Sequence, residues 1–291
     1  MIILYLTFGK NTEYHVQAYL SMLSFRRQMR DYDRLVVVTN VPEFYNHVRE
    51  WAEIVTINDR QVQEWKGKHQ YMFRVKTMVI KQQAEAFPES HLLFVDTDTL
   101  LYGNLEGIRT KLDEGVGLLH RNEGHPSKMK GASHKMWKRV EGRTYNGITL
   151  SEKHVMWNSG IIGMPKGQTR QITNDTLLLL DCMLNDGVKS FNVEQYAMSI
   201  AMTEHVPLVE GHQYVAHYWA VKDQWFQAGM ELMARVLLTD ASLEEEMQMY
   251  EALDFSQLPV FVHKSNTARR LKGLIGRLFR DRNFKYIQKR T

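Results

Sequence analysis

Two acidic residues directly follow a strand of buried type, in the sequence HLLFVDTDTLLYGNL at residues 91–105. Asp96 and Asp98 come after the apolar run Leu92–Val95. Carboxylates at the end of such a strand are costly to bury unless a positive charge meets them. Their oxygens suit Mg²⁺ or Mn²⁺, ions that commonly bridge substrate phosphates in proteins. The pair alone leaves two interpretations open, a metal site or a solvated strand end at which Asp98 or Thr99 caps a turn.

The elements that must position this pair alternate between strands and helices. We expect strands at 2–8, 34–40, 52–58 and 91–96, and helices at 13–29, 41–51 and 70–87. Short apolar runs separated by helical periods predict βαβ units, and therefore an α/β fold with a mainly parallel sheet. In such sheets ligands bind at the carboxyl ends of the strands, which is where the acidic pair falls.

Residues 120–154 interrupt this alternation. The segment is polar, basic and rich in glycine, and we expect an irregular insertion that is either functional or a variable surface loop. Beyond it we expect a strand at 155–165, helices at 169–187 and 193–204, and a strand pair within 206–219. The predicted organisation is one domain over residues 1–225 and a helical C-terminal extension over 226–291.

The composition limits the kinds of covalent cross-link, metal site and cellular location that we expect. The single cysteine, Cys182, excludes an intrachain disulfide and zinc sites built on several cysteines, so a reducing, cytoplasmic location is expected. No stretch approaches the ~20 apolar residues of a membrane span. The opening MIILYLTFGK is typical of a first core strand rather than of a signal peptide.

Five short motifs, taken in order over roughly residues 1–222, resemble those of glycosyltransferase family 8, the group of glycogenin and the bacterial lipooligosaccharide galactosyltransferases. The motifs are FRVK, VDTDTLLYGNL, WNSGIIGMP, VEQYAMS and AHYW. The resemblance implies the GT-A fold, a UDP-sugar donor, manganese or magnesium as cofactor, and transfer with retention of anomeric configuration. It also implies a glycan acceptor.

The resemblance assigns roles to particular residues. It implies that Asp96, Asp98 and His217 hold the metal, with His263 as the alternative third ligand. The catalytic residues that it implies are Asn158, Glu194 and Gln195. The donor-binding residues that it implies are Thr7, Arg74, Lys76, Asp96, Thr97, Asp98, Asn158, Ser159, Gly160 and Lys222.

Some of these assignments compete with ordinary structural roles. Arg74 suits bidentate phosphate binding, but it and Lys76 could equally belong to solvated helix faces. Glu194 stands where the family usually carries Asp. After His217 the family's glycine and proline are replaced by Ala220 and Gln224, which leaves the register of Lys222 open.

The mechanism and the activity itself have alternatives. Retention can proceed through a covalent glycosyl-enzyme or by attack on the same face, and we favour the latter because Gln195 is a poor nucleophile. A sugar-phosphate nucleotidyltransferase is one rival, although TFGKNTEY lacks the glycine-rich, basic loop it would need after the first strand. A non-catalytic nucleotide-sugar-binding protein of the same fold is the other.

The C-terminal residues 264–291 contrast with the rest of the chain. They contain ten Lys or Arg and one acid (+9), whereas the remainder carries 27 basic and 32 acidic residues (−5). Their apolar residues recur at helical spacing, at Leu271, Leu274, Ile275, Leu278 and Phe279. A basic amphipathic helix predicts peripheral binding to an anionic membrane surface and hence a lipid-linked or lipopolysaccharide-type acceptor. A terminal helix packed on the acidic body is the alternative, and nucleic acid is not expected because no aromatic platform accompanies the charges.

The aromatic residues of the 120–154 insertion suggest where such an acceptor would bind. Trp137 and Tyr145, with His134 beside them, could stack on a sugar face in the insertion.

Overall fold

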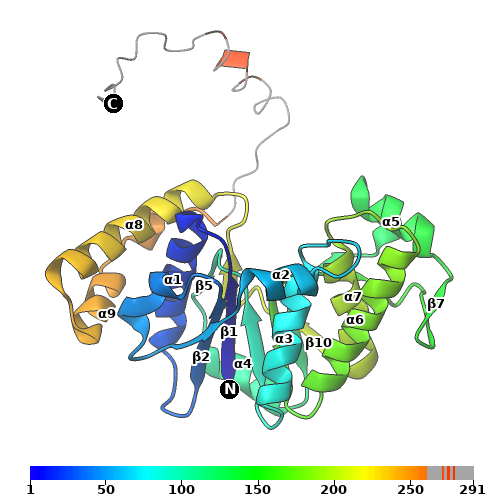
Figure 1. Ribbon diagram of the computed structural model, residues 1–291, viewed down its shortest axis with the longest axis horizontal. Coiled ribbons are helices and arrows are strands. Elements are labelled where there is room, and N and C mark those ends of the chain that lie inside the picture. Colours follow the sequence, from blue (N-terminus) through cyan, green and yellow to red (C-terminus); the bar gives the residue numbers. More distant parts are fainter. Residues whose placement is uncertain (261–270, 272–273, 276–277, 279–291) are drawn as a thin grey trace.

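Strand β1 (Ile2–Thr7) is buried on both sides, near the middle of a seven-stranded sheet (Figure 1). The computed structural model describes residues 1–260 together with 271, 274, 275 and 278. The strand order is β10-β6-β9-β4-β1-β2-β3. The other six strands are β2 (Arg34–Thr39), β3 (Glu53–Thr56), β4 (Leu92–Val95), β6 (Gly117–Gly124), β9 (Met156–Met164) and β10 (Leu208–Glu210). Strands β1 to β4 are mutually parallel, and β9 runs antiparallel between β4 and β6. The predicted mainly parallel α/β sheet is confirmed.

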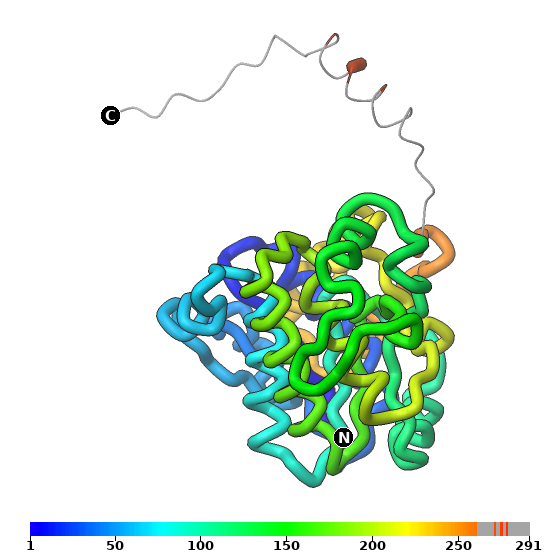
Figure 2. The backbone as a smooth tube through the Cα atoms, turned by 90° about the vertical axis from the view of Figure 1, so that its right-hand side faces the viewer, coloured from blue at the N-terminus to red at the C-terminus, as the bar shows by residue number. Residues whose placement is uncertain are grey.

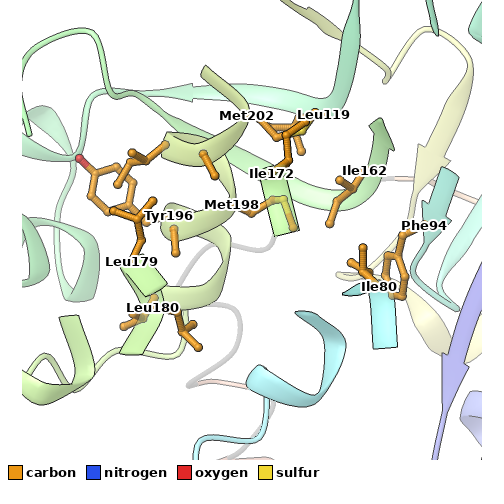
Figure 3. Close-up of a cluster of buried hydrophobic side chains, with 14 of the residues drawn as sticks. Ile80, Phe94, Leu119, Ile162, Ile172, Leu179, Leu180, Tyr196, Met198 and Met202 are labelled. Carbon is orange, nitrogen blue, oxygen red and sulfur yellow. The ribbon is translucent and has the colours of Figure 1, made fainter. Parts of the chain in front are cut away.

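Alternate residues of β1 enter two separate cores, because successive side chains of a strand point to opposite faces. Ile2 and Leu4 belong to a core beneath one helical layer (Figure 3), and Ile3 and Tyr5 to a core beneath the other. The first layer consists of α2 (Asp59–Trp65), α3 (Arg74–Ala86), α5 (Ala132–Val140), α6 (Thr169–Asn185) and α7 (Val193–His205). The second consists of α1 (Thr12–Arg26), α4 (Leu105–Asp113), α8 (Lys222–Thr239) and α9 (Leu243–Glu251). Burial on both faces explains why these strands are continuous apolar runs rather than alternating ones.

Two helices differ from the sequence-based expectation. The helix expected at 41–51 is a 3-10 helix, η1 (Pro42–Val48). The helix expected at 70–87 begins only at Arg74, because Gly67 and Gln70 adopt positive φ in the turns before it. Helices α2 and α4 were not expected.

The segment 120–154 is built of regular elements rather than of an irregular loop. After β6 it contains η2 (Pro126–Lys128), α5, and a hairpin of β7 (Thr144–Tyr145) and β8 (Ile148–Thr149). These green segments lie in front of the sheet in Figure 2. Trp137 and Tyr145 are only 2% and 6% exposed, and both belong to the first core. They therefore cannot stack on a sugar as expected, and His134 Nδ1 donates a local hydrogen bond to the Ser127 carbonyl.

The C-terminal helices pack on the body of the protein. The boundary expected at residue 225 falls inside α8, which lies against α1 where Gly229 meets Val16. A β-carbon at Gly229 would lie 2.7 Å from Val16 Cγ1, so glycine permits this close helix contact. The short helical turn η3 (Phe255–Gln257) follows α9.

Little of the basic C-terminal segment falls within the described residues. Leu271, Leu274, Ile275 and Leu278 are helical and exposed, and the other residues of 264–291, with His263, lie outside the described part of the chain. Among the described residues, no helix has the length and apolar character needed to cross a bilayer.

Candidate active site

A small two-stranded sheet brings a distant histidine to the acidic pair. Strand β5 (Thr99–Leu101) follows Asp98 directly and pairs antiparallel with β11 (Val215–His217), which places His217 opposite Thr99. His217 Nε2 lies 3.3 Å from Asp98 Oδ1. Asp96, Asp98 and His217 each offer a ligand atom, and these atoms all lie within 4.8 Å of one another. The structure therefore brings together the three residues expected to hold a metal.

Cations from two helices meet the carboxylates. Lys76 Nζ of α3 lies 3.0 Å from Asp96 Oδ1, and Lys222 Nζ at the start of α8 lies 2.6 Å from Asp98 Oδ2. Burial of Asp98 works to raise its pKa, but hydrogen bonds and charges from His217 and Lys222 hold that pKa well below its usual range. Asp98 is thus a carboxylate despite being only 6% exposed.

A cavity of about 340 Å³ opens in front of this cluster, at the carboxyl ends of β1 and β4. Its polar lining includes Thr7, Lys76, Thr97 and Lys222 beside the three acidic and imidazole groups. Its apolar and aromatic lining comes from Leu6, Phe8, Tyr14, Met72, Phe73 and Phe94. The cavity thus combines charged and aromatic lining, and Lys222 Nζ lies 5.8 Å from the centre of the Tyr14 ring.

A second cavity, of about 620 Å³, is lined in part by the same histidine. His217 lines both cavities. Tyr102 and Trp219 line the second cavity and are each 57% exposed. Its polar lining includes His120, Arg121, Glu123, Asn158 and His212. Burial and the charge of His217 lower the pKa of His120 to about 4, so this imidazole is neutral at physiological pH.

A buried polar group supports the acidic pair from behind. Lys76 Nζ donates to the Ser159 carbonyl over 2.7 Å, and Ser159 Oγ lies 3.4 Å from Glu194 Oε2. Burial raises the pKa of Glu194 to about 7, against the lowering effect of Lys76. Glu194 is 3% exposed, and its Oε1 has no hydrogen-bond partner among the described residues. Glu194 therefore sits behind Ser159 rather than on the cavity wall.

The remaining expected residues divide between the site and its surroundings. Asn158 Oδ1 lies 3.1 Å from His217 Nδ1, and the Gly160 carbonyl accepts a hydrogen bond from the Asp96 N–H. Arg74 forms a bidentate ion pair with Asp181 and donates a hydrogen bond to the Trp65 carbonyl. It does not line the cavity in front of Asp96 and Asp98.

Glu123 is a residue that the sequence analysis missed. Its two oxygens accept hydrogen bonds from Asn158 Nδ2 over 3.2 Å and from Gln195 Nε2 over 3.0 Å. It joins the end of β6 to β9 and α7. The sequence VGLLH at residues 116–120 could have indicated a strand here, and Glu123 falls at the end of that strand.

The fold is similar to that of solved glycosyltransferase structures. An active-site mutant of the galactosyltransferase LgtC matches with a TM-score of 0.50 and 12% identity, over 72% of each chain. LgtC in complex with donor and acceptor sugar analogues matches with a TM-score of 0.49 and 12% identity, over 72% of this chain and 73% of that one. Mouse xyloside xylosyltransferase 1 in its apo form matches with a TM-score of 0.48 and 11% identity, over 72% and 85%. This protein has the GT-A fold.

Comparison of the sequence with known families and curated proteins finds no match. No family model matches this chain, and no curated protein matches it. At 12% identity the match to the LgtC mutant shows the fold alone, and the two matches with TM-scores below 0.5 add nothing to it.

The close approach of Gly160 to His217 allows a direct test of the cluster of Asp96, Asp98 and His217. A β-carbon there would lie 2.2 Å from His217 Nδ1, so Gly160→Ala must displace the imidazole from Asp98. We expect at least tenfold weaker Mn²⁺ binding in isothermal titration, the scale on which metal affinity responds to ligand misplacement. Gly163→Ala on the same strand is the matched control, since its nearest neighbour is Leu118 Cδ1 at 3.1 Å. Equal Mn²⁺ affinity in both variants would contradict a role for His217 as ligand.

Proposed function

We propose that this chain is a metal-dependent, retaining glycosyltransferase of the family 8 type, which moves a hexose from a UDP-sugar to a glycan acceptor. The observation that carries the proposal is the cluster of Asp96, Asp98 and His217 at the mouth of a cavity, on the GT-A fold. The cluster stands at the carboxyl ends of parallel strands, where ligands of such sheets bind.

The donor set of the cluster fits a hard divalent ion. Two carboxylates and one imidazole suit Mn²⁺ or Mg²⁺, and the adjoining cavity leaves room for diphosphate oxygens. When bound, the ion would offset the negative charge that develops on the departing diphosphate. Lys222 lines the same cavity and supplies a fixed positive charge there.

The aromatic lining of this cavity fits the nucleoside of the donor. Tyr14 and Phe73 offer ring faces for a base, while Thr7 offers a hydroxyl at the end of β1. Thr97 completes the wall between the acidic residues, and Ser159 and Gly160 support it from β9. Uridine is taken from the family resemblance rather than from a side chain in this cavity.

The positions of the candidate nucleophiles favour attack on the same face. In this step the bond between the anomeric carbon and the diphosphate oxygen breaks, and its electron pair leaves with UDP. The acceptor hydroxyl oxygen bonds to that carbon on the face just vacated, and its proton passes to a diphosphate oxygen. The Gln195 amide is bonded to Glu123, and Glu194 is shielded behind Ser159, so neither presents a carboxylate to the anomeric carbon.

The second cavity fits the acceptor glycan. Tyr102 and Trp219 offer exposed aromatic faces on which sugar rings stack, and Glu123 accepts hydrogen bonds from sugar hydroxyls. Because His217 lines both cavities, an acceptor here lies beside a donor in the first cavity. This site takes over the role first expected for the aromatic residues of 120–154.

The C-terminal segment supports a lipid-linked acceptor on an anionic membrane surface. Val260 lines the second cavity and lies four residues before residue 264, where the basic segment starts. Its apolar residues Leu271, Leu274, Ile275 and Leu278 are helical and exposed rather than packed on the body. A cytoplasmic protein held peripherally on the membrane, with no nucleic-acid partner, fits this arrangement.

Thermal unfolding with nucleoside diphosphates tests the donor and the metal together. We expect UDP with Mn²⁺ to raise the melting temperature by several degrees, since a ligand at a hundred times its Kd adds about 2.7 kcal/mol. GDP, CDP, ADP and dTDP, or UDP without Mn²⁺, should shift it much less. Asp98→Asn should abolish the rise in melting temperature. Asp31→Asn, at an exposed residue, is the control and should preserve it. No nucleotide response would contradict the proposed donor, whereas a response without transfer of labelled sugar would favour the non-catalytic alternative.

Trp219→Ala tests the acceptor site separately from the donor site. Loss of one stacking face costs about 1 kcal/mol, so KM for an alkyl glycoside acceptor found by screening should rise about fivefold. The affinity for UDP with Mn²⁺ should stay unchanged. Phe191→Ala is the control, because this exposed aromatic ring lies outside the second cavity. Equal effects of the two substitutions on acceptor KM would refute this placement.

Vesicle binding tests the membrane proposal. The full chain should sediment with vesicles rich in phosphatidylglycerol, and release with rising salt as screening weakens the attraction. Leu274→Asp with Ile275→Asp should prevent sedimentation, because both exposed side chains would enter the interface. Leu238→Asp, on an even more exposed apolar residue of α8, should have no effect. Binding that survives the double substitution would exclude the apolar stripe as the anchor.

A further inference from the structure

Two further cavities have no role in the proposed reaction. The first, which we call the α5 cavity, has a volume of about 630 Å³ and is lined by residues within 131–139 and 187–190. The second, the adjoining cavity, has a volume of about 710 Å³ and lies between the same loop and residues 69–73. We infer that the α5 cavity, continued by the adjoining cavity, binds an acidic glycan. The inference goes beyond the proposed function and does not depend on it.

The described residues that line the α5 cavity include three cations and no acid. Lys135 and Arg139 are four residues apart on α5, so they lie on one face of that helix. Lys189 comes from the loop between α6 and α7, on the opposite wall. Three positive groups from two elements therefore surround one hollow.

The acids of the neighbouring segments are already paired with other cations. Glu141 pairs with Lys138, and Asp186 pairs with Arg143 and accepts a hydrogen bond from Tyr145. No ion pair within the described part of the chain includes the three cations of the α5 cavity. Their charge is therefore available to a ligand, and Lys and Arg form their strongest hydrogen bonds with carboxylates and phosphates.

The two walls of the α5 cavity are joined to each other. Asn192 Nδ2 donates to Ser133 Oγ over 2.7 Å, and Arg139 Nη1 donates to the Asp186 carbonyl over 3.5 Å. Gly187 has positive φ, and a β-carbon there would lie 3.3 Å from Arg139 Nη1, so glycine lets the loop pass close to the guanidinium. The backbone that carries the cations is thus in place before a ligand binds, which lowers the cost of binding.

The adjoining cavity extends this site toward the acidic pair. Residues 187–190 line both it and the α5 cavity, while Met72 and Phe73 line both it and the cavity in front of Asp96 and Asp98. Tyr71, Met72 and Phe73 give it an apolar and aromatic wall, which suits the apolar faces of sugar rings. The combined volume exceeds what a single small anion needs. A wall for sugar rings followed by three cations fits a short chain of sugars that carries carboxylate or phosphate groups.

Isothermal titration of the full chain with two matched oligosaccharides tests the site without donor or metal. A tetrasaccharide of β-1,4-linked glucuronate carries one carboxylate on each sugar, and cellotetraose has the same backbone without them. We expect cellotetraose to bind about tenfold more weakly than the acid, because hydrogen bonds to charged groups contribute more than those between neutral groups. Binding of the acid should weaken with rising salt. Equal affinity for the two oligosaccharides would overturn the inference.

Charge reversal separates this cavity from general attraction to a basic surface. One variant reverses the three cations of the α5 cavity: Lys135→Glu, Arg139→Glu and Lys189→Glu. The control variant changes the net charge equally, at three exposed residues of the same segment that lie outside the cavity: Lys128→Glu, Lys130→Glu and Lys138→Glu.

The cavity variant should bind the acidic tetrasaccharide at least about tenfold more weakly than wild type, and the control variant should stay close to wild type. Equal losses in the two variants would show non-specific attraction and overturn the inference. Circular dichroism checks that both variants fold. If the cavity variant does not, the single substitutions Lys189→Glu and Lys130→Glu decide in the same way.

Two further measurements identify the source of the anion. Inorganic phosphate should bind more weakly than the tetrasaccharide, and equal affinity would assign the cavity to a free anion instead of a glycan. Both triple variants should sediment equally with vesicles rich in phosphatidylglycerol. A loss of sedimentation confined to the cavity variant, without binding of the acid, would assign these cations to lipid headgroups and overturn the inference. Because no transferase activity is measured, failure of the proposed function would leave these results standing.

Discussion

Asp96 and Asp98, the two carboxylates at the end of β4, require nearby positive charge. Much of the site consists of the groups that supply it. Lys76 comes from α3, Lys222 from the start of α8 and His217 from β11, so three distant parts of the chain converge on Asp96 and Asp98. Removing water from a carboxylate costs several kcal/mol unless such partners replace it. The ion pairs therefore tie the C-terminal helices to the sheet as well as shaping the cavity.

The elements that carry the acidic pair could be predicted from the sequence because their signals are local. Strands β1, β2 and β4 are continuous apolar runs, and each is buried on both faces. The acids after β4 stand out because they end such a run. His217 could be predicted only through the resemblance, since three residues of β11 carry little periodicity of their own.

The remaining features depend on pairings between distant residues, which local patterns do not encode. Arg74 has the residue type for phosphate binding, but Asp181, on a helix that packs beside it, takes up its guanidinium. Trp137 falls in a polar, basic segment, yet α5 turns that ring into the core and leaves its charged residues outside. Glu123 gains its role only because β6 and β9 are neighbours in the sheet.

Among the described residues that line the two cavities, only His217 lines both. On the proposed function, a change in this ring alters the donor and acceptor cavities together. Substitutions at the far rim, where Tyr102 and Trp219 lie, reach only one of them. Substitutions that adapt the protein to new acceptors are therefore expected at Tyr102 and Trp219, whereas His217 is constrained by the donor and the acceptor at once.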